Sequence, residues 1–154
     1  MSKENREVLS DWMTVFGAAI LLGSLFLTWS HQFSAPFLAE FGPAINGVPR
    51  DPTAWQVYSA ADIVLALLAV GLLVTALFGS RGARLVAAVA AGIAVAFVVH
   101  ALAVPPTDGA NIFNPALSVP AYAPAGSTSG PGETVALIGL LVALVGLAVS
   151  FTAE

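Results

Sequence analysis

Hydrophobic and polar residues follow each other in long blocks along this chain, without the two-residue alternation of a half-buried β-strand. The apolar runs cover about residues 13–29, 58–78, 85–104 and 134–151. Each run approaches the roughly 20 residues that a helix needs to cross a bilayer, and a helix pairs its backbone polar groups internally. The pattern therefore predicts an all-α fold with four transmembrane helices. Their expected ranges are about 11–31, 54–79, 83–104 and 132–152.

The composition supports a membrane location. Hydrophobic residues make up 58% of the 154 residues and charged residues 9%, against about 45–50% and about 25% in soluble domains. Such a chain has too few polar groups to cover a soluble surface. The first run is longer than the apolar core of a signal peptide, and no Ala-x-Ala site follows it, so we expect a retained helix. We expect one membrane domain over residues 1–154.

The basic residues predict the orientation in the membrane. Four of the five lie in the N-terminal tail or in the "GSRGAR" turn between the second and third runs, and the fifth is Arg50. Four helices place the tail, this turn and the C-terminus on one side, which the positive-inside rule makes cytoplasmic. We therefore expect an up-down-up-down bundle in the plasma membrane, with both termini cytoplasmic. The outer loops are then about 32–53 and 105–131.

The outer side carries aromatic residues and a second, unusual loop. Aromatic side chains are enriched at membrane interfaces, and we expect this role for Trp29, Trp55 and Tyr58. The 105–131 loop is rich in Pro, Gly and Ser but also holds Phe113 and Tyr122. A free linker would be more polar. We expect this loop to pack on the first outer loop or on another subunit.

Small residues recur on single faces of the predicted helices. Such residues let helices approach closely in a membrane. The fourth helix shows the pattern at steps of four and three, and the third at steps of four. The expected packing residues are Gly132, Ala136, Gly139, Ala143 and Gly146 in the fourth helix, and Ala88, Gly92 and Ala96 in the third. The pattern fits contacts inside the bundle as well as contacts between copies.

Ionisable groups fall near the outer ends of all four helices. Asp62 interrupts the apolar stretch "SAADIVLAL" on a small-residue face, so we expect it to face protein. It precedes Arg81 by 19 residues and His100 follows Arg81 by 19, which makes Asp62 and His100 level in an antiparallel pair. We expect a direct or one-water contact between them. His31 and Glu133 belong to the same region.

Three interpretations of this cluster remain open. The first is a structural polar network that fixes the bundle register. The second is a proton or cation site. The third is a metal or haem site that uses His31 and His100. No H-E-x-x-H spacing supports the third interpretation. The chain has no cysteine, no basic run, and no nucleophile–base, phosphate-loop or dinucleotide motif. We expect no catalytic residue, no bound metal, no cofactor and no nucleic-acid partner.

Short motifs resemble a set of proteins. "LLGSLFLTW", a tryptophan before the second helix, and "YSAADIVLALLAV" look like small, uncharacterised four-helix membrane proteins of actinobacteria, in which the first motif often reads L-F-L-P-W. The resemblance implies a fold and no activity. The topology is also similar to that of claudin-type proteins, by analogy only, because the Gly-Leu-Trp motif and the paired cysteines of their first loop are missing.

These features predict a non-enzymatic structural or accessory subunit. Its expected partners are the lipid bilayer and a homo-oligomer or larger membrane complex, because apolar patches outside the membrane indicate partners. The first alternative is a small ion or proton transport or channel protein that uses the Asp/His/Glu cluster. The second alternative is a lipid or small-ligand binder.

Overall fold

A computed structural model describes residues 3–31, 51–57, 60–105 and 128–153 of the chain. It confirms an all-α fold with four helices that are long and apolar enough to cross a membrane. These helices are α1 (Lys3–Ser24), α4 (Ala61–Phe78), α5 (Arg81–Ala103) and α7 (Pro131–Ala153). A short helix, α3 (Ala54–Val57), and two short strands, β1 (Ser30–His31) and β2 (Thr128–Ser129), complete the described part.

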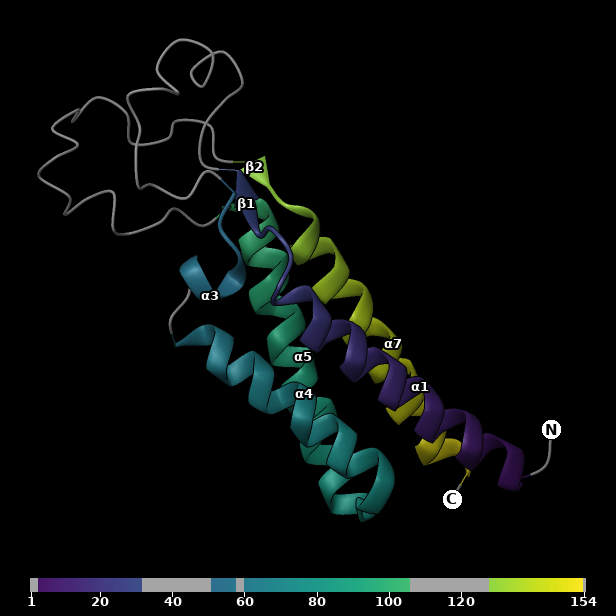
Figure 1. Cartoon of the computed structure of the whole chain (residues 1–154). Helices are drawn as coiled ribbons and strands as arrows, with labels where there is room; N and C mark the ends of the chain where they lie inside the picture. The colour runs from purple at the N-terminus through teal and green to yellow at the C-terminus, as the bar shows by residue number, and fades with distance from the viewer. Residues whose placement is uncertain (1–2, 32–50, 58–59, 106–127, 154) are drawn as a thin grey trace, which may run out of the picture.

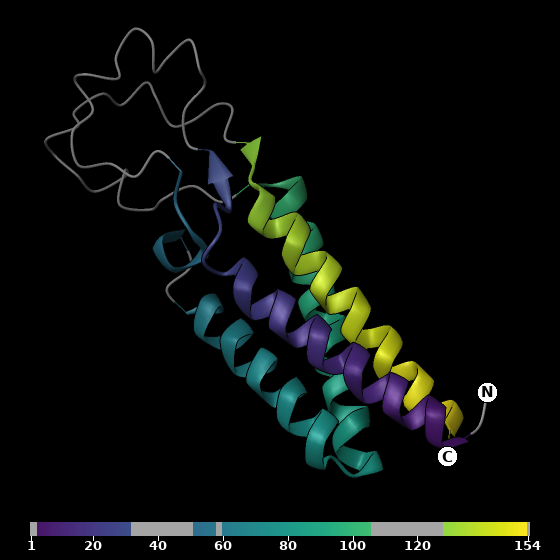
Figure 2. The same ribbon diagram turned by 45° about the vertical axis from the view of Figure 1, so that its right-hand side comes forward.

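The long helices form an elongated bundle (Figures 1 and 2). α1 packs most extensively on α7 and also on α4, while α5 packs on α7 and α4. Going round the bundle, the order is therefore α1, α4, α5, α7, and α4 and α7 lie across the bundle axis from each other. The N- and C-termini lie together at one end, and β1 and β2 lie at the other (Figure 1). We name these the terminal end and the junction end.

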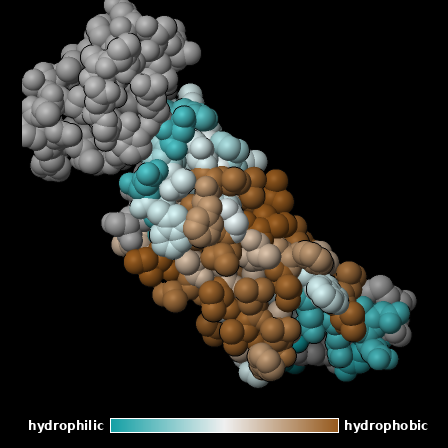
Figure 3. Space-filling view, in the orientation of Figure 1, coloured by the Kyte–Doolittle hydropathy of each residue, from teal (hydrophilic) through white to brown (hydrophobic). Residues whose placement is uncertain are grey.

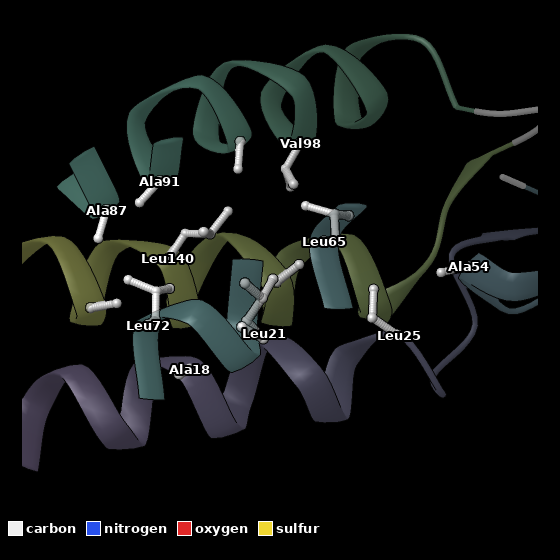
Figure 4. Packing of buried hydrophobic residues seen from close by; sticks show 14 of the residues in the cluster. Ala18, Leu21, Leu25, Ala54, Leu65, Leu72, Ala87, Ala91, Val98 and Leu140 are labelled. Atoms are coloured by element: carbon white, nitrogen blue, oxygen red, sulfur yellow. The ribbon is translucent and has the colours of Figure 1, made fainter. Parts of the chain in front are cut away.

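Apolar side chains fill the bundle and also cover its outside. Leu21, Leu65, Leu72, Val98 and Leu140 come from all four long helices and meet in one buried cluster (Figure 4). Large apolar side chains also point outward along the same helices, and hydrophobic residues cover the middle of the bundle between two hydrophilic ends (Figure 3). An apolar belt between polar ends is the surface that a bilayer requires.

The contact between α1 and α7 is very close. A Cβ atom at Gly139 would lie 2.7 Å from the backbone nitrogen of Leu21, and one at Gly146 would lie 2.8 Å from that of Thr14. A Cβ at Gly17 would likewise clash with the α7 backbone. The structure places all five predicted packing residues of α7 at buried positions, namely Gly132, Ala136, Gly139, Ala143 and Gly146.

The predicted packing row of α5 is wrong as an internal seam. Ala88 is only half-buried, Gly92 and Ala96 are exposed, and a Cβ at Gly92 would meet nothing within 4 Å. The buried row of α5 lies on a neighbouring face and consists of Ala87, Ala91, Ala94, Val98 and Ala101. The reason is that α5 is so rich in alanine that more than one face carries small residues at helical spacing.

The first helix begins and ends earlier than the predicted range of 11–31. It begins at Lys3, because the charged residues before the apolar run are themselves good helix formers. It ends at Ser24, where Leu25 N–H bonds to Leu22 O at 3.3 Å and Phe26 N–H bonds to Gly23 O at 3.2 Å, in tight turns. Hydropathy marks the apolar span, and these turns end the helix inside it.

The predicted second helix, 54–79, is divided into α3 and α4. Thr53 N–H donates to Gln56 Oε1 at 3.0 Å at the start of α3, which is one half of a capping box. Trp29 N–H bonds to Pro52 O, and this bond holds the start of α3 against the segment after α1. The other two helices lie close to their predicted ranges of 83–104 and 132–152.

Candidate functional site

Three chain segments meet at the junction end of the bundle. Trp29 N–H donates to Pro52 O at 2.9 Å, Gly130 N–H to Trp29 O at 2.8 Å, and Gly132 N–H to Thr28 O at 2.8 Å. β1 pairs antiparallel with β2, and Thr28 pairs with Thr53 in an isolated bridge. We name residues 28–31, 52–53 and 128–132 the junction. It joins the end of α1, the start of α3 and the start of α7.

Trp29 is the centre of the junction, so its expected role as an interface anchor is wrong. The residue is 0% exposed, and its indole Nε1–H donates to Ser24 O at 2.8 Å, which satisfies a carbonyl at the end of α1. A Cβ atom at Gly132 would lie 2.7 Å from Trp29 Nε1, so glycine makes room for the indole ring. The pairing of 28–31 with 128–132 brings Gly132 beside the indole ring and contributes to its burial.

The other two predicted anchors differ from Trp29. Trp55 is 39% exposed, and its ring lies against Phe26 with the ring centroids 6.0 Å apart. Tyr58 lies outside the described residues. Trp55 thus keeps the exposed position that an interface aromatic needs.

Two carboxylates are completely buried near the junction. Asp62 lies in the first turn of α4 and Glu133 in the first turn of α7, and both residues are 0% exposed. Among the described residues, none offers a hydrogen bond to any of the four carboxylate oxygens. Figure 2 shows that both helices begin at the junction end. The two buried carboxylates therefore belong to the same end of the bundle, on helices that lie across the axis.

The helical period explains why these polar groups are inside. Asp62 begins the buried row of α4, which continues with Leu65, Ala69, Leu72 and Ala76, while its neighbours Ile63 and Val64 are exposed. In α7, Glu133 lies above Leu140 and Leu147 at steps of seven. Pro131 at the first position of α7 is compatible with a helix start, and a helix N-terminus favours a negative charge.

The two histidines do not join the buried carboxylates. His100 is exposed in the last turn of α5, so the direct contact with Asp62 that the equal spacing predicts is wrong. The inward positions near it are Val98 and Ala101, and a helix rotates by about 100° per residue. His31 Nδ1 lies 2.6 Å from Asp51 Oδ1, and these side chains are 45% and 59% exposed. The equal spacing from Arg81 predicts the level of a residue along the bundle, but it does not predict the helix face on which the residue lies.

A metal centre built from several side chains is not seen within the described segments. These contain no group of three or more His, Cys, Asp or Glu residues that would hold an ion. Neither histidine reaches the interior, so the described part gives no support to a haem or metal site that uses His31 and His100. Among the described residues, the buried ionisable groups are the carboxyl groups of Asp62 and Glu133.

Below these carboxylates the described interior is apolar. Leu21, Leu65, Leu72, Val98 and Leu140 occupy it, and all are 3% exposed or less. At the junction-side end of α1, the buried Ser24 Oγ–H donates to Leu21 O at 2.6 Å. Further buried polar groups lie toward the terminal end, in the interface of α1 and α7. There Ser10 Oγ–H donates to Gly146 O at 2.8 Å and Thr14 Oγ1–H donates to Ser10 O at 2.9 Å. No continuous polar path is formed by the side chains that the structure describes.

The outer surface carries an apolar groove between α4 and α5, the least extensively packed of the four neighbouring helix pairs. Its volume is about 440 Å³. The lining side chains come from both helices: Ala61, Val64, Leu65, Leu68, Ala90, Ile93, Ala94 and Phe97. Leu65 also belongs to the core, so it separates the groove from the bundle interior.

No protein-family model, curated protein or solved structure matches this chain. The resemblance to small actinobacterial membrane proteins therefore stays a prediction from the short motifs alone.

Proposed function

We propose that this chain is a non-enzymatic structural or accessory subunit of a larger membrane assembly. The observation that carries the proposal is the junction. His31 and Asp51 flank residues 32–50, the first outer segment. His31 Nδ1 lies 2.6 Å from Asp51 Oδ1. Residues 106–127 return at β2, which pairs with β1. Both outer segments thus have at least one end at or next to the hydrogen-bonded junction, on a membrane-spanning stem.

The distribution of basic residues supports the orientation within this proposal. Lys3 and Arg6 begin α1, while Arg81 and Arg84 begin α5, and all four lie at the terminal end. Arg84 Nη2 lies 3.2 Å from Asp11 Oδ1, which joins α5 to α1 at that end. The positive-inside rule then makes the terminal end cytoplasmic and the junction external. The membrane is the plasma membrane, and the junction presents the outer segments to partners.

Native mass spectrometry in mild detergent tests the proposal. We expect the purified chain to appear in a complex of defined mass and not as a monomer. Gly130→Val should release the partner, because a Cβ at residue 130 would lie 2.7 Å from Thr28 C and would force the junction apart. The matched control is Gly71→Val, where a Cβ would meet nothing within 4 Å. A monomer in all three samples would contradict a subunit role.

The groove between α4 and α5 favours lipid binding as a second candidate function. It lies on membrane-spanning helices, where the surrounding solvent is hydrocarbon, so a lipid acyl chain is the occupant that fits it. Ala90→Leu should fill the groove and reduce the lipid that remains bound in native mass spectra. Val89→Leu adds volume at a residue that does not line the groove and should change nothing. Equal lipid retention by both variants would remove this candidate.

The transport alternative receives less support from the described interior. A conducting path needs polar groups or water along its length, and the two buried carboxylates instead lie above a tightly closed apolar core. These carboxylates therefore call for a different explanation.

A further inference from the structure

We propose that Asp62 and Glu133 together bind a hard metal cation inside the junction end of the bundle. The site is independent of the accessory role proposed above. Its basis is the placement of two fully buried carboxylates, from helices on opposite sides of the axis, at one end of the same interior.

The energetic argument starts from the missing counter-charge. A buried charge is costly unless it is paired, and acidic residues at membrane depth nearly always have a partner. The described basic residues Lys3, Arg6, Arg81 and Arg84 all lie at the terminal end, away from Asp62 and Glu133. No hydrogen-bond donor from the described chain meets either carboxylate. A bound cation would supply the missing positive charge.

The donor atoms indicate the class of cation. The carboxylates offer oxygen only, the chain has no cysteine, and both histidines lie outside the interior. Oxygen donors without nitrogen or sulfur favour hard cations over zinc and copper. Two carboxylates balance one divalent ion, and Ca²⁺ accepts irregular, bidentate carboxylate geometry, whereas Mg²⁺ demands near-ideal octahedral geometry and retains several waters. Ca²⁺ is therefore the probe of choice.

The surroundings of the site indicate what the cation does. The apolar core below it closes the route toward the terminal end, so the ion enters and leaves from the junction. α1 and α7 already pack closely through glycine contacts, while α4 and α7 lie across the axis and pack much less extensively on each other. An ion held by Asp62 and Glu133 would join α4 to α7 across the axis. We infer that the ion stabilises the packing of α4 and α5 against α1 and α7, together with the junction at the same end.

The test is thermal unfolding of the full chain in detergent, with a chelator or with Ca²⁺, Mg²⁺ or Na⁺ at constant ionic strength. We expect Ca²⁺ to raise the Tm by about 5–10 °C at a hundredfold excess over Kd, and the other ions to raise it less. Asp62→Asn, Glu133→Gln and the double variant should all lose this rise to the same extent, because one ion needs both groups. Asp51→Asn, at an exposed carboxylate next to the junction, should keep it.

Several results would overturn the proposal. One is a wild-type Tm that no cation raises, which would mean that the carboxyl groups are held as neutral acids. Another is loss of the response in only one of the two single variants, or in the Asp51→Asn control. Calorimetric titration of the wild-type chain with Ca²⁺ provides a measurement that needs no variant to fold. It should show one ion per chain, and absence of binding there would also reject the site.

Discussion

Gly139 of α7 faces the backbone of Leu21 in α1, where a Cβ at residue 139 would lie 2.7 Å from Leu21 N and 2.8 Å from Gly17 O. Backbone atoms cannot move aside as the end of a flexible side chain can. This contact therefore fixes the distance between the two most extensively packed helices, and it makes the side-chain volume at residue 139 a test of the bundle.

Gly139→Leu should destabilise the chain by about 1–3 kcal/mol, because overpacking forces the helices apart. Thermal unfolding in detergent measures the effect. Gly71→Leu is the matched control, since a Cβ at residue 71 meets nothing within 4 Å. Equal Tm values for the two variants would show that the α1–α7 contact is not as close as described.

Trp29→Phe should cost about 1–3 kcal/mol of stability, because Ser24 O loses its indole donor in a buried environment. Denaturation followed by circular dichroism reports the loss. Trp55→Phe should change stability by less than about 0.5 kcal/mol, as it removes no described hydrogen bond from a side chain at the surface. If Trp55→Phe were the more damaging substitution, Trp29 would not be the centre of the junction.

His100→Ala should leave stability within about 0.5 kcal/mol of the wild type, because the side chain is exposed and does not meet Asp62. A double-mutant cycle between His100→Ala and Asp62→Asn is the measurement. The expected coupling energy is below about 0.5 kcal/mol, as for residues without shared partners. A coupling energy above about 1 kcal/mol is typical of residues in contact, and it would restore the Asp62–His100 pairing that the equal spacing from Arg81 predicts.

Single cysteines test the orientation cleanly, because the chain has none of its own. Ser129→Cys in β2 and Gly82→Cys at the start of α5 both place the thiol at an exposed position. An impermeant maleimide on intact cells should label the first variant and not the second. The reverse pattern would invert the proposed topology.

The sequence determined the fold class and the positions of the long helices, because crossing a bilayer demands apolar length and a helical backbone. It also placed Asp62 inside, and the structure confirms this at 0% exposure, since a carboxylate in an apolar helix avoids lipid. The glycine row of α7 was readable because bulky residues occupy its opposite face. The predicted packing row of α5 was wrong because alanine is common on several faces of this helix. The helices that surround α5 decide which of these faces is buried.

Tertiary structure alone decided the junction and the surroundings of the ionisable groups. Trp29 has the residue type and sequence position of an interface anchor. Gly132, more than a hundred residues later, leaves the space that its buried indole ring occupies. The spacing from Arg81 predicts that Asp62 and His100 are level, but the rotation of α5 about its own axis leaves His100 exposed. Rotation and long-range pairing depend on side-chain volumes summed over several helices, which no local stretch of sequence contains. Local sequence therefore specified the span of each helix, while packing between helices specified which side chains meet.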